Sequence, residues 1–295
     1  GAKADGITDT LPILERAIAT VPNIPQPYLP FGYNLRGTFY FPGSAKTYYF
    51  SDTFNCYDAI TIIGDEGMDS YMATVLYWPT NTTGIHVRAN QDGVMRGSHG
   101  FRGANFKVKS VITTQDYTNH GILFNRPGHL NNVHAEGFGG AGFCIQSNIE
   151  GIADIGYMVN CSAYSNGLAG LYTIGVDSNQ WVIENINVFG NTRFGVWEKS
   201  FLGNTYISPH SNSNTVVPNN PVWCFNNGET YACIADNTNK EPGVAADWED
   251  YWVLVDLGVG AATLYYPQWT SSFNFLEGGC YVSEGDTNAS DWGNN

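Results

Sequence analysis

The chain has 295 residues, a formal charge of −14 at pH 7 and 34 glycines, and only 14% of its residues are charged. Its length allows one large core, and a surface built mostly from Asn, Ser, Thr and Gly favours β-structure over helices. The acidic balance argues against nucleic-acid binding, and no apolar run reaches the roughly 18 residues that a membrane span needs. No basic-then-apolar signal segment opens the chain. Because the first residue already lies within a motif, we expect that the natural N-terminus has been removed or is not included.

The first predicted element is an amphipathic helix at about residues 10–21. Asp9 or Thr10 supplies the N-cap, and Pro22 ends the helix. Its apolar residues recur at helical spacing: Leu11, Leu14, Ala17, Ile18 and Val21. The stretch GTFYFPGSAKTYYF, residues 37–50, then predicts two strands across a Pro-Gly turn.

Beyond residue 80 two short patterns recur. The first is Gly, apolar, any residue, apolar, and it begins at Gly84, Gly121, Gly142, Gly170 and Gly195. The second alternates apolar and polar residues after an Asn, and it occupies 105–110, 132–137, 160–167, 185–191 and, with Tyr in place of Asn, 206–212. The last three complete repeats have ten residues from Asn to Gly, whereas the distance from Gly to the next repeat varies from 11 to 18.

A constant connection that alternates with a variable one predicts a coil with one fixed corner and one insertable loop. Such coils stack into a solenoid, in which each coil buries its inward row against its neighbours. A barrel or a sandwich would also give many short strands, but neither predicts the constant corner. We therefore expect an all-β parallel β-helix, with the helix at 10–21 capping the open end of the first coil.

The opening GAKADGITDT, followed by GTFYFPGSAKTYYF, resembles the start of pectate-lyase-superfamily proteins, which are right-handed parallel β-helices. Residues 197–214 and 275–285 also resemble stretches of bacterial and phage β-helix proteins. The resemblance implies a right-handed β-helix, and the relatives include polysaccharide lyases, hydrolases, epimerases and trimeric phage tailspikes. The Asp-Pro-His motif of the epimerases is absent, because Ser208 stands where the acid would be.

We expect residues 1–215 to form the capped β-helix and residues 273–295 to return to it as a final strand and tail. Residues 216–272 break the repeat and would be an insertion, a C-terminal subdomain or an oligomer contact. Within them, Cys224 and Cys233 bracket an Asn-Asn-Gly turn and either form a disulfide or remain two buried thiols. A disulfide would suit an extracellular protein.

Because strand side chains alternate, the apolar positions of the second pattern identify the side chains that face outward. Two outward rows are predicted. They are Lys107, His134, Ser162, Asn187 and Ser208, and then Lys109, Glu136, Tyr164, Phe189 and His210. Residues two apart on a strand are separated by roughly 7 Å and stacked coils by about 4.8 Å. The residues at the centre of these rows would therefore form a patch about the size of a sugar subsite.

We expect Lys109, His134, Glu136 and Tyr164 to be catalytic, with Lys107 binding the substrate. Lys109 would lower the pKa of Glu136, Glu136 would keep His134 partly protonated, and burial under a substrate would raise the Glu136 pKa. Such a cluster suits acid/base cleavage of a glycosidic link. The alternative is a solvated surface of mutually neutralising charges. Six of the 13 Lys and Arg residues lie between 88 and 126, which favours the functional interpretation.

Four further residues are expected to bind substrate. Arg88 and Arg102 belong to the same basic segment. Tyr172 and Trp197 are predicted to stack in adjacent coils, which suits the apolar face of a pyranose. Burial of this aromatic pair under the variable loops is the alternative.

The variable loops also carry carboxylates, at Asp154, Asp177 and Glu184, and a pair of them would indicate hydrolysis. The cysteines lack CxxC spacing, so no zinc site is expected. No cofactor is expected either, although Ca²⁺ bound by Asp and backbone oxygens stays open.

Together these features predict an extracellular protein that cleaves a polysaccharide, with an anionic chain as the expected substrate. In a lyase, His134 or Tyr164 would act as base or acid while the Lys and Arg residues neutralise the uronate carboxylate. In a hydrolase, Glu136 would donate the proton. The alternative from another class is a non-catalytic adhesin or virion spike that binds glycans, for which the tailspike resemblance would imply a homotrimer.

Overall fold

The structure is a computed structural model that describes most of the first 212 residues and several later strands. The described ranges are 1–21, 24–25, 34–57, 59–65, 73–88, 101–111, 118–147, 153–175, 177–200, 204–212, 223–226, 229–233, 252–254, 265–267, 275–277 and 280–282. None of the helices in this part of the chain is long and apolar enough to span a membrane.

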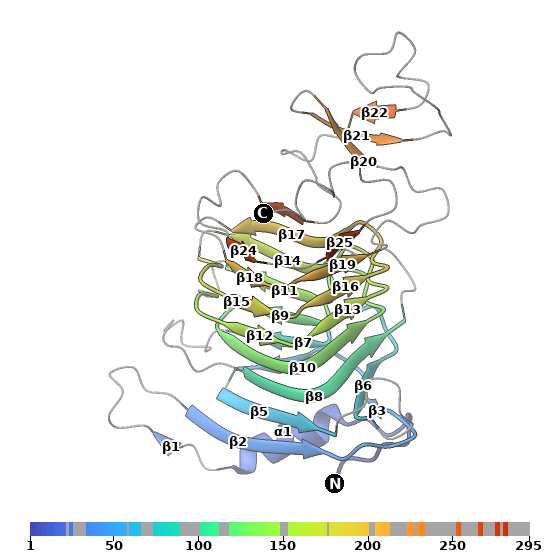
Figure 1. Cartoon of the computed structure of the whole chain (residues 1–295). Coiled ribbons are helices and arrows are strands. Elements are labelled where there is room, and N and C mark those ends of the chain that lie inside the picture. Colours follow the sequence, from blue (N-terminus) through green and yellow to red (C-terminus); the bar gives the residue numbers. More distant parts are fainter. Residues whose placement is uncertain are drawn as a thin grey trace.

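The chain winds into a parallel β-solenoid of about five turns, so the predicted fold class is confirmed. Figure 1 shows the coils stacked along one axis, with the N-terminal elements at one end. The larger sheet contains β1 (Ile24–Pro25), β2 (Asn34–Phe41), β3 (Tyr48–Tyr49), β5 (Ala59–Gly64), β6 (Val75–Trp78), β8 (Phe101–Ser110), β10 (Gly128–Glu136), β12 (Tyr157–Val159), β13 (Ser162–Tyr164), β15 (Val182–Glu184), β16 (Asn187–Phe189), β18 (Thr205–Ile207), β19 (His210–Asn212), β24 (Phe275–Glu277) and β25 (Cys280–Val282).

The second sheet carries the Gly-apolar pattern, and all of its neighbouring strands are parallel. Its strands are β4 (Phe54–Cys56), β7 (Ile85–Val87), β9 (Ile122–Phe124), β11 (Phe143–Gln146), β14 (Ala169–Gly175), β17 (Phe194–Ser200) and β23 (Tyr265–Pro267). The constant ten-residue spacing is the connection from the larger sheet to this one. The variable spacing is the connection back.

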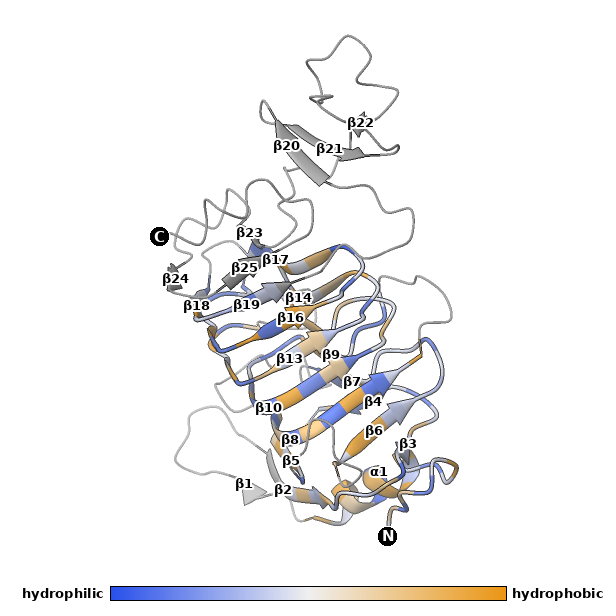
Figure 2. Ribbon diagram, turned by 45° about the vertical axis from the view of Figure 1, so that its right-hand side comes forward, coloured by the Kyte–Doolittle hydropathy of each residue, from blue (hydrophilic) through white to orange (hydrophobic). Residues whose placement is uncertain are grey.

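The larger sheet bends in five successive coils at a residue with a positive φ, which in four of them is the Asn that opens the second pattern. The bend residues have φ values of 60°, 54°, 53°, 51° and 48° at Asn105, Asn132, Asn160, Asn185 and Ser208. Asn tolerates this left-handed region better than most residues because its short side chain bonds locally. The strands after the bend are β6, the second halves of β8 and β10, and β13, β16 and β19. We call their outward side the post-bend face, and Figure 2 shows hydrophobic and hydrophilic residues alternating along β8 and β10.

The last coil departs from the expected alignment by two residues. Ser208, not Tyr206, is the bend residue, with a φ of 48°. In addition, β19 places His210 beside Asn187. Ser208 therefore does not belong to the outward rows, and His210 lies one row away from its expected neighbour Phe189.

The physical reason is that the apolar pattern continues across this bend. Tyr206 is fully buried and pairs with Ile183 in β15, so it belongs to the strand before the bend. Pro209 is buried just after the bend, as its counterpart Ile186 is in the preceding coil. Because Ser rather than Asn stands at this bend, the sequence is equally compatible with a bend at 206 and a bend at 208.

The predicted N-terminal helix is present as α1 (Leu11–Thr20), and it lies across the N-terminal end of the solenoid in Figure 1. Leu11 and Leu14 are buried in the main hydrophobic core. Asp9 rather than Thr10 provides a side-chain acceptor at its start, since Asp9 Oδ1 accepts from the Leu11 backbone N–H at 3.1 Å. The helix thus covers the apolar end of the first coil.

Past residue 212, described strands occur both in the solenoid and outside it. β24 and β25 pair in parallel with β18 and β19, so residues 275–277 and 280–282 extend the larger sheet. β20 (Trp223–Asn226), β21 (Glu229–Cys233) and β22 (Trp252–Leu254) form a separate antiparallel sheet. The predicted hairpin is therefore present, and its register places Cys224 opposite Tyr231. The two cysteine side chains lie outside the described part of the structure.

Candidate functional site

The post-bend face brings together the residues at the centre of the two predicted rows. The register of β8, β10, β13 and β16 aligns Lys107, His134, Ser162 and Asn187 in one row. The second row is Lys109, Glu136, Tyr164 and Phe189. Strand pairing alone therefore gathers side chains from residue 107 to residue 189 on one wall, as the sequence predicts.

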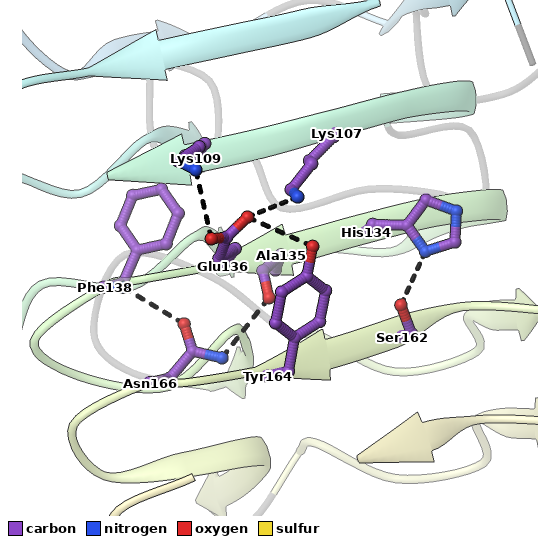
Figure 3. A network of polar contacts seen from close by, with 9 residues as sticks. All are labelled: Lys107, Lys109, His134, Ala135, Glu136, Phe138, Ser162, Tyr164 and Asn166. Atoms are coloured by element: carbon purple, nitrogen blue, oxygen red, sulfur yellow. Dashed lines mark hydrogen bonds and ion pairs between the residues drawn. The ribbon is translucent and has the colours of Figure 1, made fainter. Parts of the chain in front are cut away.

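Glu136 is the centre of this face, because three side chains converge on its carboxylate (Figure 3). Lys107 Nζ forms an ion pair with Oε2, and Lys109 Nζ lies 3.1 Å from Oε1. The Tyr164 hydroxyl donates to Oε2 at 3.1 Å. We call these four residues the Glu136 cluster.

The electrostatics of the Glu136 cluster keep the carboxylate ionised. Burial raises the pKa of Glu136, but the hydrogen bonds and charges of Lys107, followed by those of Lys109, outweigh burial. The net pKa of Glu136 is therefore below its ordinary value. At neutral pH this group accepts protons and hydrogen bonds but does not donate them.

Tyr164 is held on several sides. Its ring stacks on Phe189 of the next coil, with centroids 4.9 Å apart and planes within 9°. The Lys107 ammonium lies 4.8 Å from the centroid of the Tyr164 ring. The hydroxyl is thus fixed toward Glu136 and the outer surface, and the ring faces are occupied by protein groups.

His134 shares the wall with Glu136 but belongs to a different set of hydrogen bonds. Its Nδ1 lies 2.6 Å from the Ser162 hydroxyl oxygen, and its Nε2 lies 3.2 Å from Asn132 Oδ1. In Figure 3 the ring points away from the Glu136 cluster and toward Ser162. Only 7% of His134 is exposed. Ser162 and Asn132 thus both contribute to the orientation of this histidine.

The two predicted arginines lie outside the Glu136 cluster. Arg102 is exposed on the part of β8 before the bend, and its neighbours across the sheet are Thr61 and His129. Arg88 follows β7 in the second sheet, where its Nη1 lies 3.4 Å from Asn55 Oδ1 and its guanidinium 5.8 Å from the Tyr57 ring centroid. Neither arginine is part of the same wall.

Tyr172 and Trp197 stack as predicted, on the second sheet, which carries the Gly-apolar pattern. Their ring centroids are 4.8 Å apart with planes at 22°. The ring centroids of Phe194 and Trp197 are 4.6 Å apart, and Lys199 Nζ lies 4.8 Å from the Trp197 ring centroid. Burial raises the pKa of Tyr172 and lowers that of Lys199. Both aromatic rings are only partly buried, so their edges form part of a surface separate from the Glu136 cluster.

Asp154 and Asp177 lie in neighbouring coils and interact electrostatically, whereas Glu184 belongs to β15. Burial raises the pKa of Asp154, and the charge of Asp177 raises it further, while Asp154 Oδ1 accepts from the Asn179 backbone N–H at 2.8 Å. Glu184 accepts from the Tyr157 hydroxyl at 2.7 Å on the strands before the bend. Among the residues that the structure describes, no group of three or more His, Cys, Asp or Glu side chains is placed to hold a metal ion.

Three residues on or beside this wall have no role that the sequence pattern predicts: Ser162, Asn132 and Tyr77. Ser162 appears in the predicted outward row, and Asn132 opens its repeat, but nothing in the sequence shows that both bond the same imidazole ring. Tyr77 is a third, since β6 places it directly beside Lys109. Its segment lacks the Asn that marks the other repeats, so the pattern search does not find it.

Comparison of the chain with protein-family models, with curated proteins and with solved structures gave no match.

Proposed function

We propose that this protein binds an anionic polysaccharide on the post-bend face and cleaves it by β-elimination. The observation that carries the proposal is the Glu136 cluster, in which two ammonium groups and a phenol surround a carboxylate. Donors arranged around one carboxylate are suited to receive the carboxylate of a uronate unit. A polysaccharide of this kind is extracellular, and the proposal places the protein outside the cell with it.

The chemistry of elimination matches the groups that are present. A base must remove the proton at C5, cations must stabilise the charge that develops on the uronate carboxylate, and an acid must protonate the leaving oxygen. Lys107 and Lys109 supply the cations. Tyr164, whose hydroxyl donates a hydrogen bond to Glu136, serves as base or acid. His134 is the other candidate on the same wall.

The lowered pKa of Glu136 favours elimination over hydrolysis. A glycosidase needs a carboxylic acid that stays protonated near neutral pH, which requires a raised pKa. The two lysines have the opposite effect on Glu136. This residue is therefore better suited to orienting Tyr164 and the lysines than to protonating a leaving group.

Binding without cleavage is the second candidate function, as in a glycan-binding adhesin or a trimeric virion spike. One observation favours it: Lys107, Lys109 and Tyr164 satisfy the Glu136 carboxylate with protein groups alone. A surface of mutually neutralising charges needs no further ligand.

The test is a panel of acidic polysaccharides assayed for the ultraviolet absorbance of unsaturated uronate ends. Tyr164→Phe should lower the rate at least about 100-fold, as expected on removal of a proton-transfer group. Tyr157→Phe is a matched control, because Tyr157 also donates to a glutamate of a neighbouring coil but lies before the bend. It should retain full activity.

The other outcomes assign the alternatives. Shortened products without ultraviolet absorbance would replace elimination by hydrolysis. A polysaccharide that binds but is not shortened, with equal affinity for Tyr164→Phe and the wild type, would support the binding function instead.

A further inference from the structure

A second group of hydrogen-bonded side chains lies beside the Glu136 cluster, around His134. The ring stands between a serine hydroxyl on β13 and an amide oxygen at the bend of β10. The Ser162 Oγ to His134 Nδ1 distance is 2.6 Å, which is short for a hydrogen bond between a hydroxyl and a nitrogen. Both side chains are nearly covered, with 4% of Ser162 and 7% of His134 exposed.

The hydrogen-bond network determines which ring nitrogen carries the proton. Asn132 Nδ2 donates to Asn105 Oδ1 at 3.1 Å, so Asn132 Oδ1 is left as the acceptor that faces His134 Nε2. A neutral ring bonded in this way carries its proton on Nε2 and has a bare Nδ1. The bare Nδ1 then accepts the proton of the Ser162 hydroxyl.

We propose that Ser162 is a nucleophile that hydrolyses esters of small acyl groups on sugar hydroxyls, such as O-acetyl groups. His134 is its general base, and Asn132 holds the ring in the required tautomer. A nucleophile bonded to a base that a third group orients is the general pattern of covalent acyl transfer. That the ester is carried on an anionic polysaccharide rests on the proposed function; the ester chemistry itself does not.

The surroundings restrict the substrate class. A nearly covered Oγ admits a small acyl carbonyl more readily than a bulky one. Lys107 is the strand neighbour of His134 on β8, and its ammonium reaches across to the ring of Tyr164, two residues from Ser162. Lys107 also pairs with Glu136, and in the proposed reaction it would be the cation of this wall that stabilises negative charge near the reacting carbonyl.

The reaction balances with water as the only co-reactant. Ser162 Oγ bonds to the acyl carbon while its proton passes to His134 Nδ1. Nδ1 returns that proton to the sugar oxygen, which leaves as a free hydroxyl when its bond to the acyl carbon breaks. Water then attacks the acyl-serine and gives a proton to Nδ1. Finally the bond from the acyl carbon to Oγ breaks, the acyl group leaves as a carboxylic acid, and Oγ regains the proton.

The same row contains a useful contrast. His210 Nδ1 lies 2.9 Å from the amide oxygen of Asn187, so this histidine contacts an acceptor rather than a hydroxyl. That contact is an ordinary hydrogen bond between polar side chains of neighbouring coils and involves no nucleophile. Of the two histidines in this row, His134 is the one whose Nδ1 is bonded to a potential nucleophile, Ser162.

The experiment treats the intact protein with a fluorophosphonate and locates the adduct by mass spectrometry. Ser162 should be modified, and the labelling needs no variant, so it does not depend on how a variant folds. Release of acetate from an O-acetylated uronate polysaccharide and from p-nitrophenyl acetate is measured in parallel. Ser162→Ala should lower both rates at least about 100-fold.

Ser110→Ala is the matched control, because Ser110 is also a strand serine with 4% exposure but donates to the Thr80 carbonyl. It should retain the acetate-releasing activity. The inference is overturned if Ser162 stays unlabelled, or if the folded Ser162→Ala protein releases acetate at the wild-type rate. Labelling and acetate release without chain cleavage would refute only the proposed elimination.

Discussion

At the scale of single residues, Glu136 shows how opposing effects decide a protonation state. The sequence predicts competition between burial and a lysine, and the structure shows two lysines prevailing over burial. Lys107 contributes more than Lys109, although the sequence interpretation stressed Lys109. Lys107 is less exposed, and its ammonium also contacts the Tyr164 ring, so it is more firmly placed beside the carboxylate.

The stability of the protein should therefore depend on the charge of Glu136. Because the folded-state pKa is lowered, the carboxylate contributes stability that is present above its unfolded pKa and lost as the pH falls through the folded value. Glu136→Gln should cost about 1 kcal/mol in the free energy of unfolding at pH 7. The difference from wild type should vanish at low pH, as measured by urea denaturation across a pH series.

Glu184→Gln is the control for this prediction. Glu184 also accepts a tyrosine hydroxyl, but it lacks the two lysines that surround Glu136. A loss for Glu136→Gln that persists unchanged at acidic pH would show that packing, not charge, accounts for it.

At the scale of elements, the constant ten-residue corner depends on glycines that allow consecutive coils to approach closely. A Cβ added to Gly121 would lie 2.4 Å from the carbonyl oxygen of Gly142, which is far inside contact distance. A Cβ added to Gly84 would likewise lie too close to the carbonyl oxygen of Gly121, and one added to Gly170 too close to that of Gly195. The recurring Gly is thus required by the stacking of backbones rather than by a turn.

Gly121→Ala should destabilise the protein by about 2 kcal/mol, because the neighbouring backbone cannot move away without breaking the parallel pairing of β9 and β11. Thermal unfolding followed by circular dichroism would measure this loss. Gly1→Ala is the neutral comparison, since its added Cβ would meet nothing within 4 Å. Equal stability of the two variants would contradict this explanation of the pattern.

The sequence predicted the bends of the larger sheet well, except for the bend in the last coil. Asn identifies the bends at 105, 132, 160 and 185, because Asn is the residue that best tolerates a left-handed backbone apart from Gly. Ser208 carries the same conformation without the same signal. Where the corner residue is not distinctive, alternation alone permits a shift of two positions, since such a shift leaves every side chain on its original face.

At the scale of the whole molecule, the solenoid is stabilised by contacts between neighbouring coils, so its ends are the weak points. Helix α1 covers the N-terminal end and contributes Leu14, which is only 3% exposed. The opposite end receives the later strands β24 and β25. Covered ends also protect unpaired strand edges from association with other chains.

Leu14→Ala should therefore cost about 3 kcal/mol and act mainly on the first coils. Hydrogen exchange should accelerate in β2 and β5 while β14, several coils away, keeps its protection. Ile7→Ala, at a side chain that is 81% exposed, should change neither. Uniform acceleration through all coils would show that the solenoid unfolds as one unit rather than from its end.

The sequence by itself determined the solenoid, the capping helix and the inward and outward sides of most strands. Each of these depends on local periodicity: alternation for the strands, helical spacing for α1, and a constant Asn-to-Gly interval for the corner. The same periodicity placed Lys107, Lys109, Glu136 and Tyr164 on one wall. Local rules suffice there because each coil repeats the geometry of the coil before it.

Only the tertiary structure decided which outward residues meet. Arg88, Tyr172 and Trp197 were expected to bind the same substrate as the Glu136 cluster, and the corner between the two sheets places them on a different surface. It also decided that His134 bonds Ser162 and Asn132. Periodicity states that a side chain faces outward, but the contact it makes depends on the angle between sheets and on the rotamers of its neighbours, which no repeat in the sequence encodes.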